Sequence, residues 1–148
     1  MINNIRGMCC IVNNKKKILV PLDGTERSMH SIDWLKNFFK EDEVDITLMN
    51  VIEIVLGNDK IELDQRYYSE KASKEILDKA EDKLHGYKIA KYHTFGYAAD
   101  KILKKAELDK FDIIVMTKST KRGLDRMIGS VTNKVVRNAG TLVAIIPE

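Results

Sequence analysis

The 148-residue sequence contains few of the residues that stabilise small secreted domains or hold metal ions. It has two cysteines, two prolines, one tryptophan and three histidines. Cys9 and Cys10 are adjacent, and neighbouring cysteines rarely reach good disulfide geometry. The histidines, at positions 30, 85 and 93, show no metal-ligand spacing. We therefore expect neither a disulfide framework nor a protein metal site.

Long apolar runs and a strong net charge are also missing. No run approaches the roughly 18 residues of a membrane span, and the start, MINNIRGMCCIVNN, is too polar for a secretory signal. The formal net charge is only +3, and the longest basic run is Lys15-Lys16-Lys17, which is a weak electrostatic footprint for nucleic acid. We expect a cytoplasmic protein that binds neither a membrane nor nucleic acid.

The residues that are present fit one ordinary globular domain. Hydrophobic residues make up 44% and charged residues 32% of the chain, and the two kinds are interleaved. A chain of this length buries roughly two-thirds of its unfolded surface around one core. Residues 1–15 precede the first regular element, so we expect an N-terminal extension that contributes little to folding, followed by a domain at residues 16–148.

Short runs rich in β-branched residues predict five strands. The run at 112–116, DIIVM, is the most apolar and predicts a central strand, whereas 87–95 alternates weakly and predicts a strand nearer an edge. The five predicted strands lie at residues 17–22, 45–51, 87–95, 112–116 and 141–146.

Apolar residues at helical spacing separate these strands and predict four helices, from Ser28 to about residue 40 and at 61–84, 98–108 and 130–137. We expect Ser28 and Ser130 to be N-caps. Alternation of strands and helices predicts a parallel α/β sheet with right-handed crossovers and helices on both faces. The apolar stripe expected for the second helix is Ala72, Ile76, Ala80 and Leu84, with Leu77 beside it.

Three loops are candidates for a binding site, because open α/β sheets bind ligands beyond the carboxyl ends of their strands. They comprise residues 21–28 after the first strand, those from Val51 onward after the second, and 117–132 after the fourth. Asp23-Gly24 follows the first strand and is compatible either with a plain turn or with a carboxylate that holds a ribose or a base. Gly129-Ser130 opens the last helix, and is compatible either with a simple cap or with a phosphate bound by free backbone N–H groups.

Four segments in this order resemble the universal stress protein family: ILVPLDGTERS, the Gly96-Tyr97-Ala98 step, DIIVM, and GSVTNKVVRNAGTLVAIIP. The resemblance spans Lys16 to Pro147. It implies an open five-stranded parallel sheet in the order 3-2-1-4-5, similar to the adenine-nucleotide alpha-hydrolase arrangement. It also implies a homodimer, which agrees with the apolar edge strand predicted at Thr141 to Ile146.

Family members that bind ATP share a loop of Gly, two residues, Gly, nine residues, Gly, then Ser or Thr. In this sequence Thr117 and Thr120 stand at the two early glycine positions, and eight residues separate Thr120 from Gly129. The resemblance therefore implies a retained adenosine half, an altered phosphate loop and weak binding of ATP or AMP, with any Mg²⁺ arriving with the nucleotide. The positions that match the pocket of ATP-binding members are Pro21, Asp23, Val51, Met116, Gly129, Ser130, Val131 and Thr132.

Three functions compete on this sequence. The first is a stress-response binding or signalling domain with a weak adenine-nucleotide pocket. The alternative is an ATP-binding protein with slow ATP hydrolase or phosphotransfer activity, but Asp23 and Asp125 are the only carboxylates expected near the Gly129 loop, and no base or metal constellation accompanies them. We therefore expect no catalytic residue. A nucleic-acid module lacks the basic face it requires.

Overall fold

Strands and helices alternate along the whole of the chain that the computed structural model describes, which comprises residues 15–53, 63–118 and 129–147. The five strands pair in parallel in the order β3-β2-β1-β4-β5. This confirms the predicted fold class and strand order. In chain order the elements are β1 (Lys16–Pro21), α1 (Glu26–Phe38), β2 (Val44–Ile52), α2 (Leu63–Glu81), β3 (Lys88–Phe95), α3 (Ala98–Leu108), β4 (Ile113–Thr117), α4 (Ser130–Asn138) and β5 (Leu142–Ile146).

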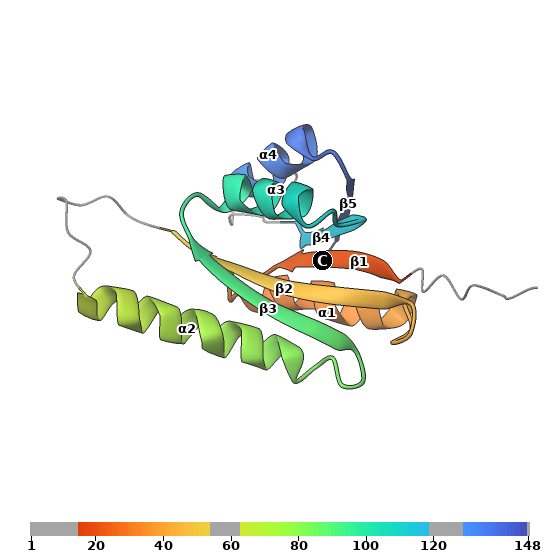
Figure 1. Ribbon diagram of the computed structural model, residues 1–148, viewed down its shortest axis with the longest axis horizontal. Coiled ribbons are helices and arrows are strands. Elements are labelled where there is room, and N and C mark those ends of the chain that lie inside the picture. The colour runs from red at the N-terminus through yellow and green to blue at the C-terminus, as the bar shows by residue number, and fades with distance from the viewer. Residues whose placement is uncertain (1–14, 54–62, 119–128, 148) are drawn as a thin grey trace, which may run out of the picture.

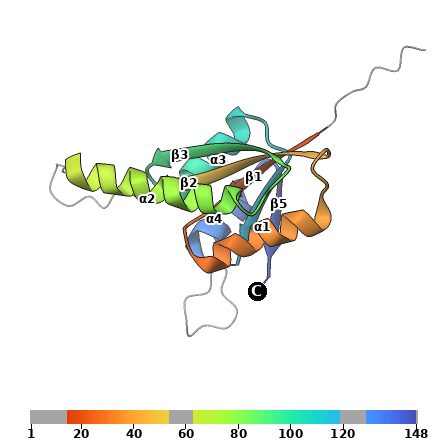
Figure 2. The ribbon, with the colours of Figure 1, turned by 90° about the horizontal axis from the view of Figure 1, so that it is seen from below.

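The helices cover the sheet in two pairs, α1 with α2 on one face and α3 with α4 on the other (Figures 1 and 2). Each pair closes its own hydrophobic cluster, one containing Ile32 of α1 and Leu77 of α2, the other Ile102 of α3 and Val135 of α4. No helix within the described residues is long and apolar enough to cross a membrane.

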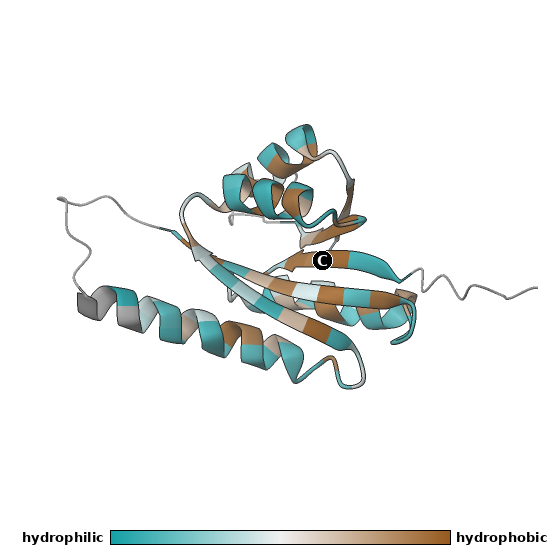
Figure 3. Cartoon of the chain, in the orientation of Figure 1, coloured by the Kyte–Doolittle hydropathy of each residue, from teal (hydrophilic) through white to brown (hydrophobic). Residues whose placement is uncertain are grey.

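Strand β1 lies in the middle of the sheet, and its residues Ile18, Leu19 and Val20 are fully buried. Figure 3 shows a hydrophobic middle of this strand after a hydrophilic amino end. The strand expected at the centre, β4, is an interior strand but lies one place from the edge, between β1 and β5. Both β1 and β4 have a strand on each side and helices on both faces, so both are rich in apolar residues. Apolar content therefore does not show which of the two is the central strand.

Both predicted N-caps are wrong: the N-cap of α1 lies about one turn before Ser28, and that of α4 lies one residue before Ser130. Thr25, not Ser28, caps α1, because its side chain accepts a hydrogen bond from the Ser28 N–H at 3.2 Å. Ser28 is buried in the first turn, where its hydroxyl donates to the Thr25 carbonyl at 2.8 Å. Helix α4 begins at Ser130 itself, with Gly129 as an N-cap that makes no side-chain hydrogen bond.

The buried stripe of α2 differs from the predicted one in its amino-terminal part. Leu77 and Ala80 are buried as predicted, as is Leu84 just after the helix, but Ser73 is buried where Ala72 is exposed, and Ile76 is only half-buried. Adjacent Ile76 and Leu77 allow two helical phases, and packing of α2 against β2 and β3 selects the one that buries Leu77. The helix also ends at Glu81, and α1 at Phe38, slightly before the predicted ends.

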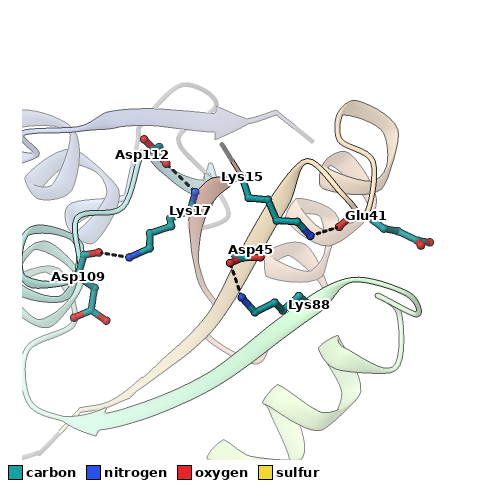
Figure 4. A network of polar contacts seen from close by, with 7 residues as sticks. All are labelled: Lys15, Lys17, Glu41, Asp45, Lys88, Asp109 and Asp112. Carbon is teal, nitrogen blue, oxygen red and sulfur yellow. Dashed lines mark hydrogen bonds and ion pairs between the residues drawn. The ribbon is translucent and has the colours of Figure 1, made fainter. Parts of the chain in front are cut away.

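Polar contacts tie together the amino end of the sheet, on the side away from the strand carboxyl ends (Figure 4). The Lys17 N–H donates to Oδ2 of Asp112 at 2.8 Å, and the Lys17 ammonium donates to the carbonyl of Asp109 at 3.0 Å. On the neighbouring strands, Lys88 and Asp45 form an ion pair at 2.7 Å. These contacts join β1 to the start of β4 and β2 to β3 across this end.

Candidate functional site

The carboxyl ends of β1, β2 and β4 and the start of α4 surround a cavity of about 830 Å³. Thr120, the tenth residue predicted from the sequence, lies outside the described residues. A second hollow, of about 640 Å³, lies near the starts of β4 and β5, and none of the predicted residues lines it. The first cavity brings together nine predicted residues: Pro21, Asp23, Val51, Met116, Thr117, Gly129, Ser130, Val131 and Thr132.

The position of the cavity follows from the way β1 pairs with its two neighbours. With β2, β1 pairs along its whole length, from Lys16 to Pro21. With β4 it pairs only at Ile18 and Leu19, so the two strands are no longer paired where they approach their carboxyl ends. The chain runs outward from β1 to β2 and β3, then crosses to the other side of β1 to form β4 and β5. This is the reversal point at which open α/β sheets form a crevice.

The lining of the cavity combines apolar side chains with a few oriented polar groups. Met49 and Met116 are buried, and Val51 is half-buried, at the ends of β2 and β4. Asn50 is also buried, and its amide donates to the Leu22 carbonyl at 2.7 Å. Apolar and polar residues contribute about equally to the lining, and apolar surface beside fixed polar groups is typical of a small-molecule site.

Asp23 is exposed on the cavity wall and is held by hydrogen bonds from the following turn. Its Oδ1 accepts from the N–H of Thr25 at 3.0 Å and from the Thr25 hydroxyl at 2.6 Å. Partial burial raises the pKa of Asp23, but hydrogen bonds from Thr25 and Ser28 outweigh that effect and hold the pKa below its ordinary value. The carboxylate is therefore ionised at neutral pH and acts as a hydrogen-bond acceptor.

The first turn of α4 forms another part of the wall. Gly129 is its N-cap, and the N–H of Asn133 closes the first turn on the Gly129 carbonyl at 2.8 Å. The first N–H groups of a helix have no partner within the helix, and they lie at the positive end of its dipole. Ser130 is exposed here, whereas Thr132 is 2% exposed. This end of the cavity suits an anionic or hydroxyl-bearing group.

Sequence reasoning missed several residues of the lining. Thr25, Glu26 and Arg27 come from the turn and first residues of α1, and Glu53 follows β2. Ala98 and Ile102 of α3 also reach the cavity. The Gly96-Tyr97-Ala98 step was the one signal for the α3 contribution, whereas Glu53 and Arg27 are ordinary surface residues in the sequence pattern.

The described residues of the site offer little machinery for catalysis. The carboxylates that line the cavity are Asp23, Glu26 and Glu53, and the described lining contains no histidine or cysteine. Across the described ranges, no group of three or more histidine, cysteine or acidic residues is arranged to hold a metal ion. The described wall therefore places carboxylate acceptors on one side of the cavity and the start of α4 on another.

Comparison with known proteins gives a consistent result. The model of the universal stress protein family matches residues 15–147. A universal stress protein of Methanocaldococcus jannaschii is 30% identical over 145 residues, which cover 92% of this chain and 84% of that protein.

Solved structures share the fold at lower identity. A universal stress protein family protein from Arabidopsis thaliana, solved with AMP bound, has a TM-score of 0.69 at 18% identity, covering 90% of this chain and 92% of that one. A universal stress protein solved in complex with cAMP has a TM-score of 0.65 at 20% identity, covering 90% of this chain and 98% of that one. At these identities the likeness shows the fold alone.

Proposed function

Because the chain belongs to the universal stress protein family, we propose that it is a stress-response binding or signalling domain that takes an adenine nucleoside or nucleotide in the cavity at the carboxyl ends of β1, β2 and β4. One observation carries the proposal. Nine residues chosen from the sequence, eight of them because they match nucleotide-pocket positions of the family, lie around a single cavity. The AMP and cAMP bound by two structural neighbours support the same class of ligand.

The chemistry of the wall fits such a ligand. Asp23 supplies an ionised acceptor for a ribose hydroxyl or an exocyclic amino group. Met49, Val51 and Met116 supply apolar surface on which a base packs. The start of α4 supplies N–H groups for a phosphate oxygen. A cavity of about 830 Å³ also falls within the usual range for small-molecule sites.

Binding, rather than hydrolysis of ATP, is the function that the acidic groups favour. A general base must have a pKa near the working pH, and hydrogen bonds to Asp23 hold its pKa below the ordinary value instead. Glu26 and Glu53 add negative charge to the described wall, which does not stabilise the charge that develops on a transferring phosphoryl group. A slow ATP hydrolase or phosphotransferase is the alternative, and a phosphate-release assay on the same protein measures it.

Calorimetric titration of the purified protein with adenosine and AMP tests the proposal. We expect dissociation constants in the micromolar range or above, and at least tenfold weaker binding by Asp23→Asn, because an amide is a weaker acceptor than a carboxylate. Asp42→Asn, in the exposed turn after α1, is the matched control and should bind like the wild type. Absence of heat with adenosine, AMP and ATP alike, together with no nucleotide released from the denatured protein, would contradict the proposal.

We also propose that the protein acts in the cytoplasm and as a homodimer. Support for the dimer comes from β5 (Leu142–Ile146), which pairs with β4 and is the last strand in the order of the described sheet. Leu142 of this strand is 64% exposed. An apolar strand at the edge of a sheet is suited to pairing with a second copy.

A further inference from the structure

Thr25 uses one hydroxyl for two hydrogen bonds at the mouth of the cavity. Its Oγ1 donates to Oδ1 of Asp23 at 2.6 Å and accepts from the N–H of Ser28 at 3.2 Å. A hydroxyl has one proton to donate and two lone pairs that accept, so the two bonds are compatible. The hydroxyl therefore connects the N-cap of α1 to the carboxylate on the cavity wall.

A second bond from the same residue fixes the direction of the carboxylate. The N–H of Thr25 also donates to Oδ1 of Asp23, at 3.0 Å. Two donors on one oxygen restrict rotation of the planar carboxylate and so fix the direction of its second oxygen, Oδ2.

The backbone on each side of Asp23 is anchored as well. The N–H of Leu22 donates to the Met49 carbonyl at 2.7 Å, and the Leu22 carbonyl accepts from the Asn50 amide at 2.7 Å. Gly24 packs closely against Ile76 of α2. Because the loop is held from both sides, an oriented Asp23 is a preorganised acceptor, and preorganised groups lose less entropy when a ligand binds.

We propose that Thr25 is a positioning residue for ligand binding: its hydroxyl holds the Asp23 carboxylate in the orientation that accepts a hydrogen bond from a hydroxyl or amino group of the bound nucleoside. The inference rests on the proposed function, since Asp23 requires a ligand from which to accept. Thr25 acts on affinity through Asp23, and its role as the N-cap of α1 is a separate, structural contribution.

Three substitutions separate the two contributions. Thr25→Ser keeps both hydrogen bonds of the hydroxyl. Thr25→Val has nearly the same shape and loses both. Thr25→Gly caps a helix about as well as threonine but has no side chain to donate to Asp23, so it preserves the start of α1 if the valine variant does not fold. A fourth variant, Lys36→Gly, weakens α1 at an exposed position in its last turn, away from Asp23.

Each variant is measured by its melting temperature, its affinity for adenosine and the pKa of the Asp23 carboxyl from NMR titration. We expect Thr25→Ser to bind adenosine within twofold of the wild type. Thr25→Val and Thr25→Gly should bind at least about tenfold more weakly, with a raised pKa of Asp23. Lys36→Gly should lower the melting temperature yet bind within twofold of the wild type, because its Asp23 is still oriented.

Two results would overturn the inference while leaving the proposed function intact. One is binding by Thr25→Gly within twofold of a wild type that itself binds adenosine. The other is an equal loss of affinity in Lys36→Gly, which would show that helix stability alone controls binding. If the wild type binds none of adenosine, AMP and ATP, the proposed function fails and the inference fails with it.

Discussion

Gly24, in the loop that follows β1, packs against the side chain of Ile76 in α2. A Cβ placed on Gly24 would lie 2.7 Å from Cδ1 of Ile76, and Gly24 has a φ of +82°, in the left-handed region. The contact joins the loop that carries Asp23 to a side chain of α2 that lies more than fifty residues further along the chain. It also accounts for the half-buried position of Ile76 beside the main stripe of α2.

Replacement of Gly24 by alanine should therefore destabilise the protein by about 1–2 kcal/mol. Most of this effect is backbone strain, since alanine adopts a positive φ unfavourably, whereas the end of Ile76 can rotate away. Denaturation in urea measures it.

Gly140→Ala is the matched control, because a Cβ at Gly140 meets nothing within 4 Å and Gly140 is not among the glycines of positive φ. We expect it to be neutral or to stabilise the protein by roughly 0.4–1 kcal/mol, through a less flexible unfolded chain. Equal losses in the two variants would show that the conformation of Gly24 is not the cause.

Asp23 should make folding stability depend on pH in the acidic range. Its folded-state pKa lies below the ordinary value of 3.8, so the carboxylate contributes stability that is present above that value and is lost as the pH falls through the lower, folded-state pKa. Wild type should therefore be more stable than Asp23→Asn at pH 7 and at pH 5, and the difference should shrink at pH 3. Urea denaturation at the three values measures this, with Asp42→Asn to show what removal of one exposed carboxylate does by itself. A difference that grows toward pH 3 would mean that the sign of the shift is wrong.

The fold was predictable from the sequence because its signals are repeated and local. Helix α3 (Ala98–Leu108) was predicted with its observed ends, since Ala98, Ala99, Ile102 and Ala106 keep one helical phase and Gly96 precedes them. In α2, adjacent Ile76 and Leu77 fit two phases, and only contact with the sheet decides between them. A buried Ser73 in the stripe could not be expected from an apolar pattern.

The candidate site was predictable where its residues stand next to the end of a strand or the start of a helix in the sequence. Asp23 and Gly129 stand directly at the ends of predicted elements, so the rule for open sheets placed them together. Thr25 was not predicted as the N-cap of α1, because both threonine and serine commonly cap helices. Only the hydrogen-bond geometry shows which of Thr25 and Ser28 is the cap. Glu53 was missed because its place on the wall depends on where β2 ends relative to β1 and α3, which is a tertiary relationship.

The dimer predicted through β5 should depend on Leu142. This side chain is 64% exposed at the start of the strand, and Val136 of α4 is 44% exposed. Light scattering at micromolar concentration should give the mass of two chains for the wild type and of one chain for Leu142→Lys. The lysine would bury an unpaired ammonium group in the interface, and the free energy of removing that charge from water opposes dimer formation. Leu108→Lys, at an equally exposed leucine that ends α3, should remain a dimer. A monomeric wild type would refute the prediction.

Adenosine and AMP should bind about as tightly as ATP, with dissociation constants of micromolar or above, because the loop that corresponds to the phosphate loop of ATP-binding family members lacks its two early glycines. Thr117 is the last residue of β4 and is paired with Ile146 of β5, so it belongs to the ladder of the sheet. Glycine lets a backbone N–H approach a phosphate oxygen closely, whereas the branched Cβ of a threonine obstructs that approach. Thr120, outside the described residues, stands at the other early glycine position.

The single-residue shortening before Gly129 adds to this effect, since it shifts Ser130 relative to the preceding loop. The contacts that we propose from Asp23 and Val51 to a nucleoside do not depend on that loop, so they should be unaffected. Titration with adenosine, AMP and ATP under the same conditions decides the question. Nanomolar binding of ATP, with AMP at least about a hundredfold weaker, or roughly 2.7 kcal/mol, would show that the threonine-containing loop binds phosphates as well as a glycine-containing one.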